Sequence, residues 1–201
     1  MPDHEHDEEH EHEHDAGAAE TDEALVAEAE RELRRRLALA QIRQYGDSVL
    51  RMRANEVLAF DDELERLAER MTGLMHDADG VGLAATQIGI LRRLFVFHHD
   101  GEDRLLVNPQ LAARSDETEV DVEGCLSLGP VRVPVERATA VTVEASDLRG
   151  EPLRLELQGL PARVVQHELD HLDGVLILDR TDPESRREAL SLLRPRLVLS
   201  R

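Results

Sequence analysis

The chain of 201 residues is poor in several residue types, and each shortage excludes a class of protein. Aromatic residues make up only 2% and tryptophan is absent, so Leu, Val, Ile and Ala must fill the core. Cys125 is the only cysteine, which excludes an intrachain disulfide and fits a reducing compartment. No apolar run approaches the roughly 18 residues of a membrane span, and the acidic N-terminus is unlike a secretory signal. We therefore expect a cytoplasmic protein with no membrane partner.

Positive charge is missing from the N-terminus. Residues 1–23 contain eleven acidic residues and no Lys or Arg, which leaves −8 of the net charge of −19 for residues 24–201. Five histidines are interleaved with these acids: His4, His6, His10, His12 and His14. Such a segment cannot bury apolar surface, so we predict a disordered tail over 1–22. It is either a solubilising tail, which we favour, or a loose binder of divalent metal. The moderate acidity of the remainder predicts no specific DNA partner.

Hydrophobic periodicity predicts an α+β fold. Apolar residues recur at helical steps in an N-terminal helical extension over 23–45 and again over 61–76, where Met71 and Met75 are expected in the core. Short strands are predicted near 94–97, 105–107, 131–135, 139–144 and 153–157, with turns at Asp100-Gly101 and Asp147–Gly150. A C-terminal helix is expected within 182–201, after Pro183. The prediction is small antiparallel β-sheets around a central helix, with additional N- and C-terminal helices.

The segment His167-Glu168-Leu169-Asp170-His171 carries the strongest functional signal. Residues four apart lie on the same face of a helix, so both imidazoles can reach one metal ion. Glu168 between them can act as a general base on water activated by that ion. The preceding residues are compatible with a helix, and Gly174 with its end. This segment predicts a metal-dependent hydrolase.

Two histidines leave the metal site incomplete, because catalytic sites usually have three protein ligands. Cys125, in the segment Glu123-Gly124-Cys125-Leu126-Ser127, is the best candidate for the third ligand. Glu188 is the alternative, and it would make the protein a zinc endopeptidase. Upstream, Gly80–Gln87 is a glycine-rich segment that ends in an amide. It suits peptide-backbone binding better than phosphate binding, because it lacks the Lys of a phosphate loop.

Together, the segments Gly80–Gln87, Glu123–Ser127 and Gln166–Gly174 resemble the peptide deformylase family. That family is marked by G-x-G-L-A-A-x-Q, E-G-C-L-S and Q-H-E-x-D-H-L-x-G, in that order. The resemblance spans about residues 41–180 and implies a deformylase-like catalytic domain over 46–181. It implies hydrolysis of the N-formyl group from the starting methionine of new polypeptides, with release of formate.

The resemblance also implies roles for individual residues. Cys125, His167 and His171 would hold one divalent metal ion, Fe(II) in the cell, with Zn, Ni or Co able to substitute. Glu168 would transfer protons, while the Gln87 amide and the Leu126 backbone N–H would stabilise the oxyanion. The implied substrate contacts are Val81, Gly82, Glu123, Gly124, Arg132 and Val164.

Three features leave alternatives open. Arginines near the C-terminus fit either a ribosome contact, as in some relatives, or an ordinary amphipathic end helix, and we slightly favour the end helix. These arginines are Arg180, Arg186, Arg187, Arg194, Arg196 and Arg201. A metal buffer built on the His-rich tail is a different class of function, which the intact Gln87, Cys125 and Glu168 disfavour. The order Gly129-Pro130 departs from the family, where the proline commonly comes first, so the rim of the substrate groove is expected to differ.

Overall fold

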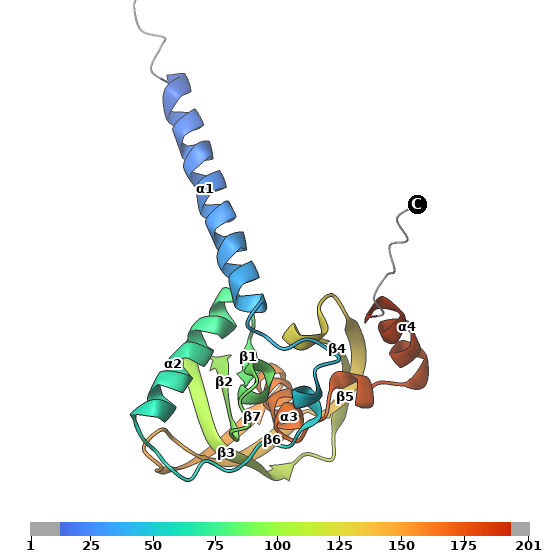
Figure 1. The fold of residues 1–201 in the computed structure, drawn as a ribbon. Coiled ribbons are helices and arrows are strands. Elements are labelled where there is room, and N and C mark those ends of the chain that lie inside the picture. The colour runs from blue at the N-terminus through green and yellow to red at the C-terminus, as the bar shows by residue number, and fades with distance from the viewer. Residues whose placement is uncertain (1–12, 194–201) are drawn as a thin grey trace, which may run out of the picture.

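The fold was analysed in a computed structural model that describes residues 13–193, and side chains from residue 24 onward. Five antiparallel strands form the main sheet in the order β1-β2-β3-β6-β7 (Figure 1). These strands are β1 (Gly82–Ala84), β2 (Leu94–His99), β3 (Glu102–Arg114), β6 (Ala140–Ser146) and β7 (Pro152–Gln158). A second sheet pairs β4 (Thr118–Gly124) with β5 (Arg132–Ala138). The predicted α+β class with small antiparallel sheets is confirmed.

Two hairpins turn where the sequence predicts. β2 and β3 are joined at Asp100-Gly101, and both residues have positive φ, of 52° and 78°. β6 and β7 are joined through Asp147–Gly150, where the Asp147 side chain accepts N–H bonds from Arg149 and Glu151, both at 2.8 Å. Local turn chemistry therefore fixes the register of both strand pairs.

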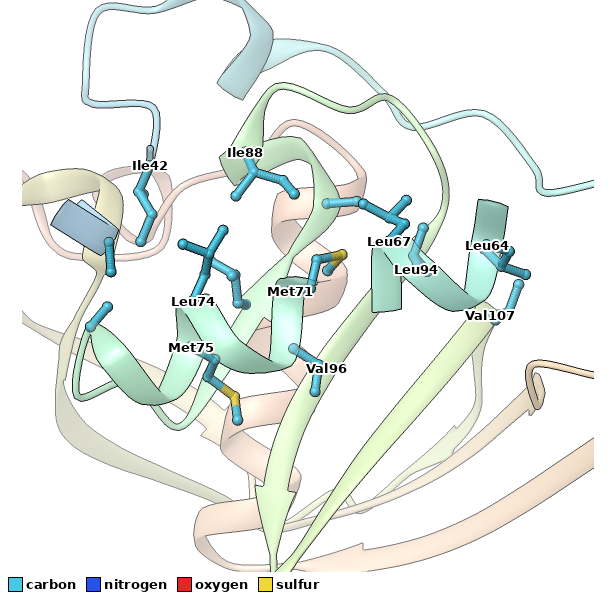
Figure 2. Close-up of a cluster of buried hydrophobic side chains, with 14 of the residues drawn as sticks. Ile42, Leu64, Leu67, Met71, Leu74, Met75, Ile88, Leu94, Val96 and Val107 are labelled. Carbon is cyan, nitrogen blue, oxygen red and sulfur yellow. The ribbon is translucent and has the colours of Figure 1, made fainter. Parts of the chain in front are cut away.

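Helix α2 (Asp62–Asp77) packs one apolar face on the main sheet. Its N-cap is Asp61, whose carboxylate accepts the N–H groups of Glu63 and Leu64 at 3.1 Å. Figure 2 shows the buried cluster between this helix and the first strands of the sheet. It contains Leu64, Leu67, Met71, Leu74, Met75, Leu94, Val96 and Val107. The prediction that both methionines belong to the core is confirmed.

Helix α3 (Leu160–Leu172) carries the two motif histidines and lies centrally, against strands of both sheets (Figure 1). Pro161 occupies its first turn, where the missing N–H costs no hydrogen bond. Gly174 follows with φ of +75°, and a Cβ there would lie 2.6 Å from the carbonyl oxygen of Arg51. Glycine is required at this helix end by both its conformation and its surroundings.

The N-terminal helix α1 (Glu13–Leu39) differs from the predicted range of 23–45. It ends at Leu39, because the chain beyond it bonds elsewhere: the N–H of Arg43 donates to the Gln87 carbonyl, and that of Tyr45 to the Ser127 carbonyl. Figure 1 shows α1 extending away from the body, and the side chains of Leu25, Leu33 and Leu37 are mostly exposed. The prediction of a disordered tail over 1–22 is wrong for residues 13–22, which belong to this helix, while residues 1–12 lie outside the described residues.

The C-terminal helix α4 (Pro183–Leu193) begins at the predicted proline, and residues 194–201 lie outside the described part of the chain. Short 3-10 helices complete the fold: η1 (Ser48–Arg51), η2 (Ala85–Ile88), η3 (Leu126–Leu128) and η4 (Ile177–Asp179). Among the described helices, none combines the length and hydropathy that crossing a membrane requires.

The α2 cluster generates a stability prediction. Met71 has no exposed surface, so Met71→Ala should lower the free energy of unfolding by about 2–5 kcal/mol, measured by urea denaturation. The matched control is Leu58→Ala, at a side chain that is 88% exposed, which should change stability by less than about 0.5 kcal/mol. Equal effects of the two substitutions would contradict this description of the core.

Candidate active site

The predicted metal ligands converge from two separate segments. Cys125 lies between β4 and η3, while His167 and His171 are one turn apart on α3. Their ligand atoms all lie within 4.8 Å of one another, and Cys125 Sγ is 3.2 Å from His171 Nε2. The two imidazole rings meet edge to face, with centroids 4.9 Å apart. The helix spacing and the β4–η3 junction thus bring three ligands to one point.

The chemistry of this cluster fits a divalent transition metal. One thiol and two imidazoles form a donor set that Zn, Fe, Co and Ni accept. His167 Nδ1 lies 3.0 Å from Glu123 Oε2, which leaves its Nε2 for the metal. Burial lowers the pKa of His167, but hydrogen bonds to Cys125 and Glu123 outweigh it and hold that pKa well above its usual value. The thiol and the carboxylate thus favour positive charge where a cation would bind.

Glu123 is a buried carboxylate that contacts the predicted metal ligand His167 and two arginines. One oxygen accepts from Arg137 Nε at 2.9 Å and from Arg163 at 2.9 Å, and the other accepts from Arg137 at 3.0 Å and bonds His167. Burial alone would raise the pKa of Glu123, yet hydrogen bonds from His167 and Arg137 lower it to about 2. The residue borders the cavity, so the substrate contact predicted for it stays a prediction, and its carboxylate also bonds His167, which the sequence did not indicate.

The ion-pair network continues away from the cavity. Arg137 also donates to Asp170 at 2.5 Å, and Asp170 accepts from Arg180 at 2.6 Å. Arg137 lies on β5 and Asp170 on α3, so the pairs connect the second sheet, the motif helix and the segment after η4. No site role was predicted for Arg137, Arg163 or Asp170, although Asp170 lies within the H-E-x-x-H motif.

Glu168 is buried beside the ligands, and its Oε2 atom has no hydrogen-bond partner in the part of the chain that the structure describes. Burial is the main cause that raises the pKa of Glu168 to about 7, against the opposing charge of His167. Its other oxygen lies against Gly82, where a Cβ would approach to 2.4 Å. Gly82 therefore makes room for a carboxyl group that can both take up and release a proton near neutral pH.

Gln87 presents its amide N–H₂ to the same point. Its Oε1 accepts the Ala84 N–H at 2.8 Å, which directs Nε2 toward Ser127 Oγ, at 3.3 Å, and Cys125 Sγ, at 3.7 Å. Leu126 is the first residue of η3, and leading N–H groups have no acceptor within their own helix. Both predicted oxyanion donors thus adjoin the cysteine. The glycine-rich segment that ends in Gln87 contains β1 and most of η2.

These groups border a cavity of about 680 Å³. All six predicted substrate residues line it: Val81, Gly82, Glu123, Gly124, Arg132 and Val164. Arg35 and Leu39 of α1 also line it, a contribution that the sequence does not indicate. Arg35 Nε lies 3.3 Å from Asp79 Oδ2, so the end of α1 is held at the cavity mouth.

Comparisons with known proteins agree with this geometry. The family model described as Polypeptide deformylase matches residues 39–187. The peptide deformylase of Thermotoga neapolitana is 48% identical over 158 residues, covering 79% of this chain and 94% of that protein. Peptide deformylase 1 of Corynebacterium glutamicum is 43% identical over 162 residues, covering 79% of this chain and 96% of that protein.

The chain belongs to the polypeptide deformylase family. Solved deformylase structures share its fold. That from Thermotoga maritima has a TM-score of 0.69 and 47% identity, covering 71% of this chain and 97% of that chain. That from Synechococcus elongatus, in complex with actinonin, has a TM-score of 0.73 and 40% identity, covering 76% of this chain and 86% of that chain. The family resemblance predicted from three motifs is confirmed.

Membership settles the class of reaction. Deformylases are metal-dependent hydrolases that remove the N-formyl group from nascent peptides. The predicted enzyme class and metal dependence are therefore confirmed. Arg35 precedes the matched residues 39–187, whereas Leu39 is the first of them, so only the Arg35 part of the α1 wall lies outside the matched deformylase region.

The Glu123 network generates a prediction about metal affinity. Glu123→Gln keeps an acceptor for His167 but removes the charge that balances Arg137 and Arg163. We expect metal affinity to fall by about 10- to 100-fold, measured by competition with a chelator. Glu119→Gln, on the exposed part of the same strand, is the matched control and should leave the affinity unchanged. An unchanged affinity in Glu123→Gln would refute the orienting role.

Proposed function

We propose that this chain removes the formyl group from the N-terminal methionine of newly synthesised polypeptides, with the residues described above in defined roles. The observation that carries the proposal is the convergence of Cys125, His167 and His171 beside the unpartnered Oε2 of Glu168. A metal-binding point, a proton-transfer group and two N–H donors thus border one cavity. This combination of groups is suited to the metal-assisted hydrolysis of an amide.

The proposed mechanism divides the chemistry among these groups. When bound, a divalent ion in this site supplies Lewis-acid activation of water and of a carbonyl oxygen. Glu168 accepts a proton from the attacking water and passes it to the departing amine, which its buried carboxyl can do because its Oε2 has no other hydrogen-bond partner among the described residues. The Gln87 amide and the Leu126 N–H donate to the oxyanion that develops on the formyl group. Their positions are set before substrate binds, so the reaction requires little rearrangement.

The proposed substrate pose follows from two sheet edges at the cavity. β1 is an edge strand of the main sheet, and β4 pairs only with β5 among the described strands. An extended peptide can add to such edges through its backbone, beside Val81, Gly82 and Gly124. The methionine side chain would pack against Val164, which is buried in the cavity wall, and Leu126. Arg132 lies at the rim of the cavity, where the peptide continues outward.

The ion and the location complete the proposal. Fe(II) is the proposed resident ion, with Zn, Ni or Co as substitutes, because a Cys–His–His set accepts all four. The proposed location is the cytoplasm, where formylated nascent chains are made. Metal analysis of protein purified without oxygen tests the first point, since an iron–thiolate site is expected to be oxidised in air.

A ribosome contact through the C-terminal helix is a separate hypothesis about the partners of the protein. The described α4 carries Arg186 and Arg187 but also Glu184 and Glu188, and Arg186 pairs with Asp179 at 3.6 Å. This balance supports the ordinary end helix, and the remaining arginines beyond Leu193 lie outside the described residues. Co-sedimentation with ribosomes that disappears at high salt would instead support docking.

The mechanism predicts a large effect of one carboxyl group. Glu168→Gln should reduce formate release from a formyl-Met-Ala-Ser peptide by about 100- to 10,000-fold, because the amide cannot transfer the proton. Glu156→Gln, on the exposed face of β7, is the matched control and should leave the rate unchanged. Metal content should be equal in all three proteins. Comparable turnover by Glu168→Gln and the parent would contradict the proposed role.

The zinc endopeptidase alternative predicts a different third ligand. Glu188 is exposed on α4, whereas Cys125 lies 3.2 Å from His171 Nε2. We therefore expect Cys125→Ala to abolish tight metal binding and Glu188→Ala to leave it unchanged, measured by metal content after dialysis. The reverse result would favour the endopeptidase. The metal-buffer alternative depends on tail residues outside the described ones, and formate release by the metal-loaded protein would count against it.

A further inference from the structure

A second group of metal-binding side chains lies on the surface, apart from the cavity. It consists of His76 in the last turn of α2, His98 near the end of β2 and Asp103 near the start of β3, and we call it the surface triad. Each residue comes from a different element, and their ligand atoms all lie within 4.8 Å of one another. The side chains are 32–48% exposed, so ions in solution can reach them.

The fold itself brings the triad together. His98 and Asp103 are cross-strand partners in the β2–β3 hairpin, so their side chains lie on the same face. Phe97, the residue before His98, is buried in the core, which directs His98 to the opposite, solvent-facing side. His76 follows the buried Met75 of α2 and reaches the same face of the hairpin. The packing of α2 on the sheet thus sets the spacing of the three ligands.

The two imidazoles point at one carboxylate. His76 Nε2 lies 2.9 and 2.8 Å from the two oxygens of Asp103, and His98 Nδ1 lies 2.8 Å from Oδ1. Hydrogen bonds from His76 and His98 hold the pKa of Asp103 below its usual value, so the group is ionised at neutral pH. Donors bound to zinc at about 2.0–2.2 Å in a tetrahedron lie roughly 3.3–3.6 Å apart. The triad therefore needs only small side-chain adjustments to surround an ion.

We propose that the surface triad is a second metal site, which takes a divalent transition ion of the zinc class through two imidazole nitrogens and one carboxylate oxygen. It differs from the candidate active site in lacking a thiolate and in leaving the ion open to solvent. The net charge of −19 raises the local concentration of cations near the surface. The proposal stands independently of the deformylase activity, because metal binding is measured without turnover.

Two residues of the triad, His76 and His98, lie next to the two ends of a segment that borders the cavity. α2 ends at Asp77, and residues Ala78–Gly82 then line the cavity and lead into β1. The N–H of His98 donates to the carbonyl of Val81 at 3.0 Å, and Gly82 pairs with Phe97. An ion held by His76 and His98 therefore joins the two ends of this segment. Its binding should stabilise the cavity wall that Val81 and Gly82 form.

The direct experiment is a crystal of the full-length protein soaked in zinc and measured at the zinc absorption edge. We expect one anomalous peak between His76, His98 and Asp103, in addition to any peak at Cys125. In solution, calorimetric titration with zinc should show one equivalent fewer for His76→Gln/His98→Gln than for the parent. The parent and the double variant both retain the histidines of the N-terminal tail, so the difference in their zinc stoichiometry reports on the surface triad alone.

The matched control is His99→Gln, which removes the neighbouring histidine and should keep the parent stoichiometry. Saturating zinc should raise the unfolding temperature of the parent and of this control more than that of the double variant, because an ion bound only to the native state stabilises it. The absence of a peak at the triad in crystals with zinc at Cys125, or equal stoichiometry in parent and double variant, would overturn the proposal. The crystal result decides even where a variant folds poorly.

Discussion

The active site depends on one buried carboxylate, that of Glu123. It lies on β4, yet it neutralises Arg137 of β5 and Arg163 of α3 and fixes the ring of His167. A buried charge without partners is costly, so each of these four groups requires the others. The second sheet and the motif helix therefore adopt one relative placement, and that placement brings Cys125 within 3.2 Å of His171.

The arrangement of the proposed metal ligands follows from this placement. The cysteine is supplied by the β4–η3 junction and the histidines by α3, so the ligand set forms only when both parts are folded together. The same arrangement leaves Glu168 buried and without a partner for its Oε2 in the described structure, and residues of β1 and β4 line the cavity. Burial raises the pKa of Glu168 to about 7, so the fold that assembles the proposed ligands also shifts the titration of the proposed proton-transfer group.

Local patterns in the sequence predicted much of this structure. The apolar stripe of α2, both hairpin turns and the motif helix all depend on residues close in sequence. The network of Glu123, Arg137 and Asp170 was not predicted, because its members are separated by 14 and 33 residues and follow no periodic pattern. β4 was also missed, although Thr118, Val120 and Val122 alternate with acidic residues, and both valines are mostly exposed. The place of Arg35 at the cavity required the packing of α1 to be known.

The central claim is that one thiolate and two imidazoles hold the catalytic ion. X-ray absorption of the full-length protein, loaded with less than one equivalent of zinc so that the tightest site fills first, tests it most directly. The account predicts one sulfur neighbour at about 2.3 Å together with nitrogen neighbours at about 2.0–2.1 Å from two imidazoles. A shell of nitrogen and oxygen alone would show that Cys125 does not bind the ion, and the proposed assembly of the site would be wrong.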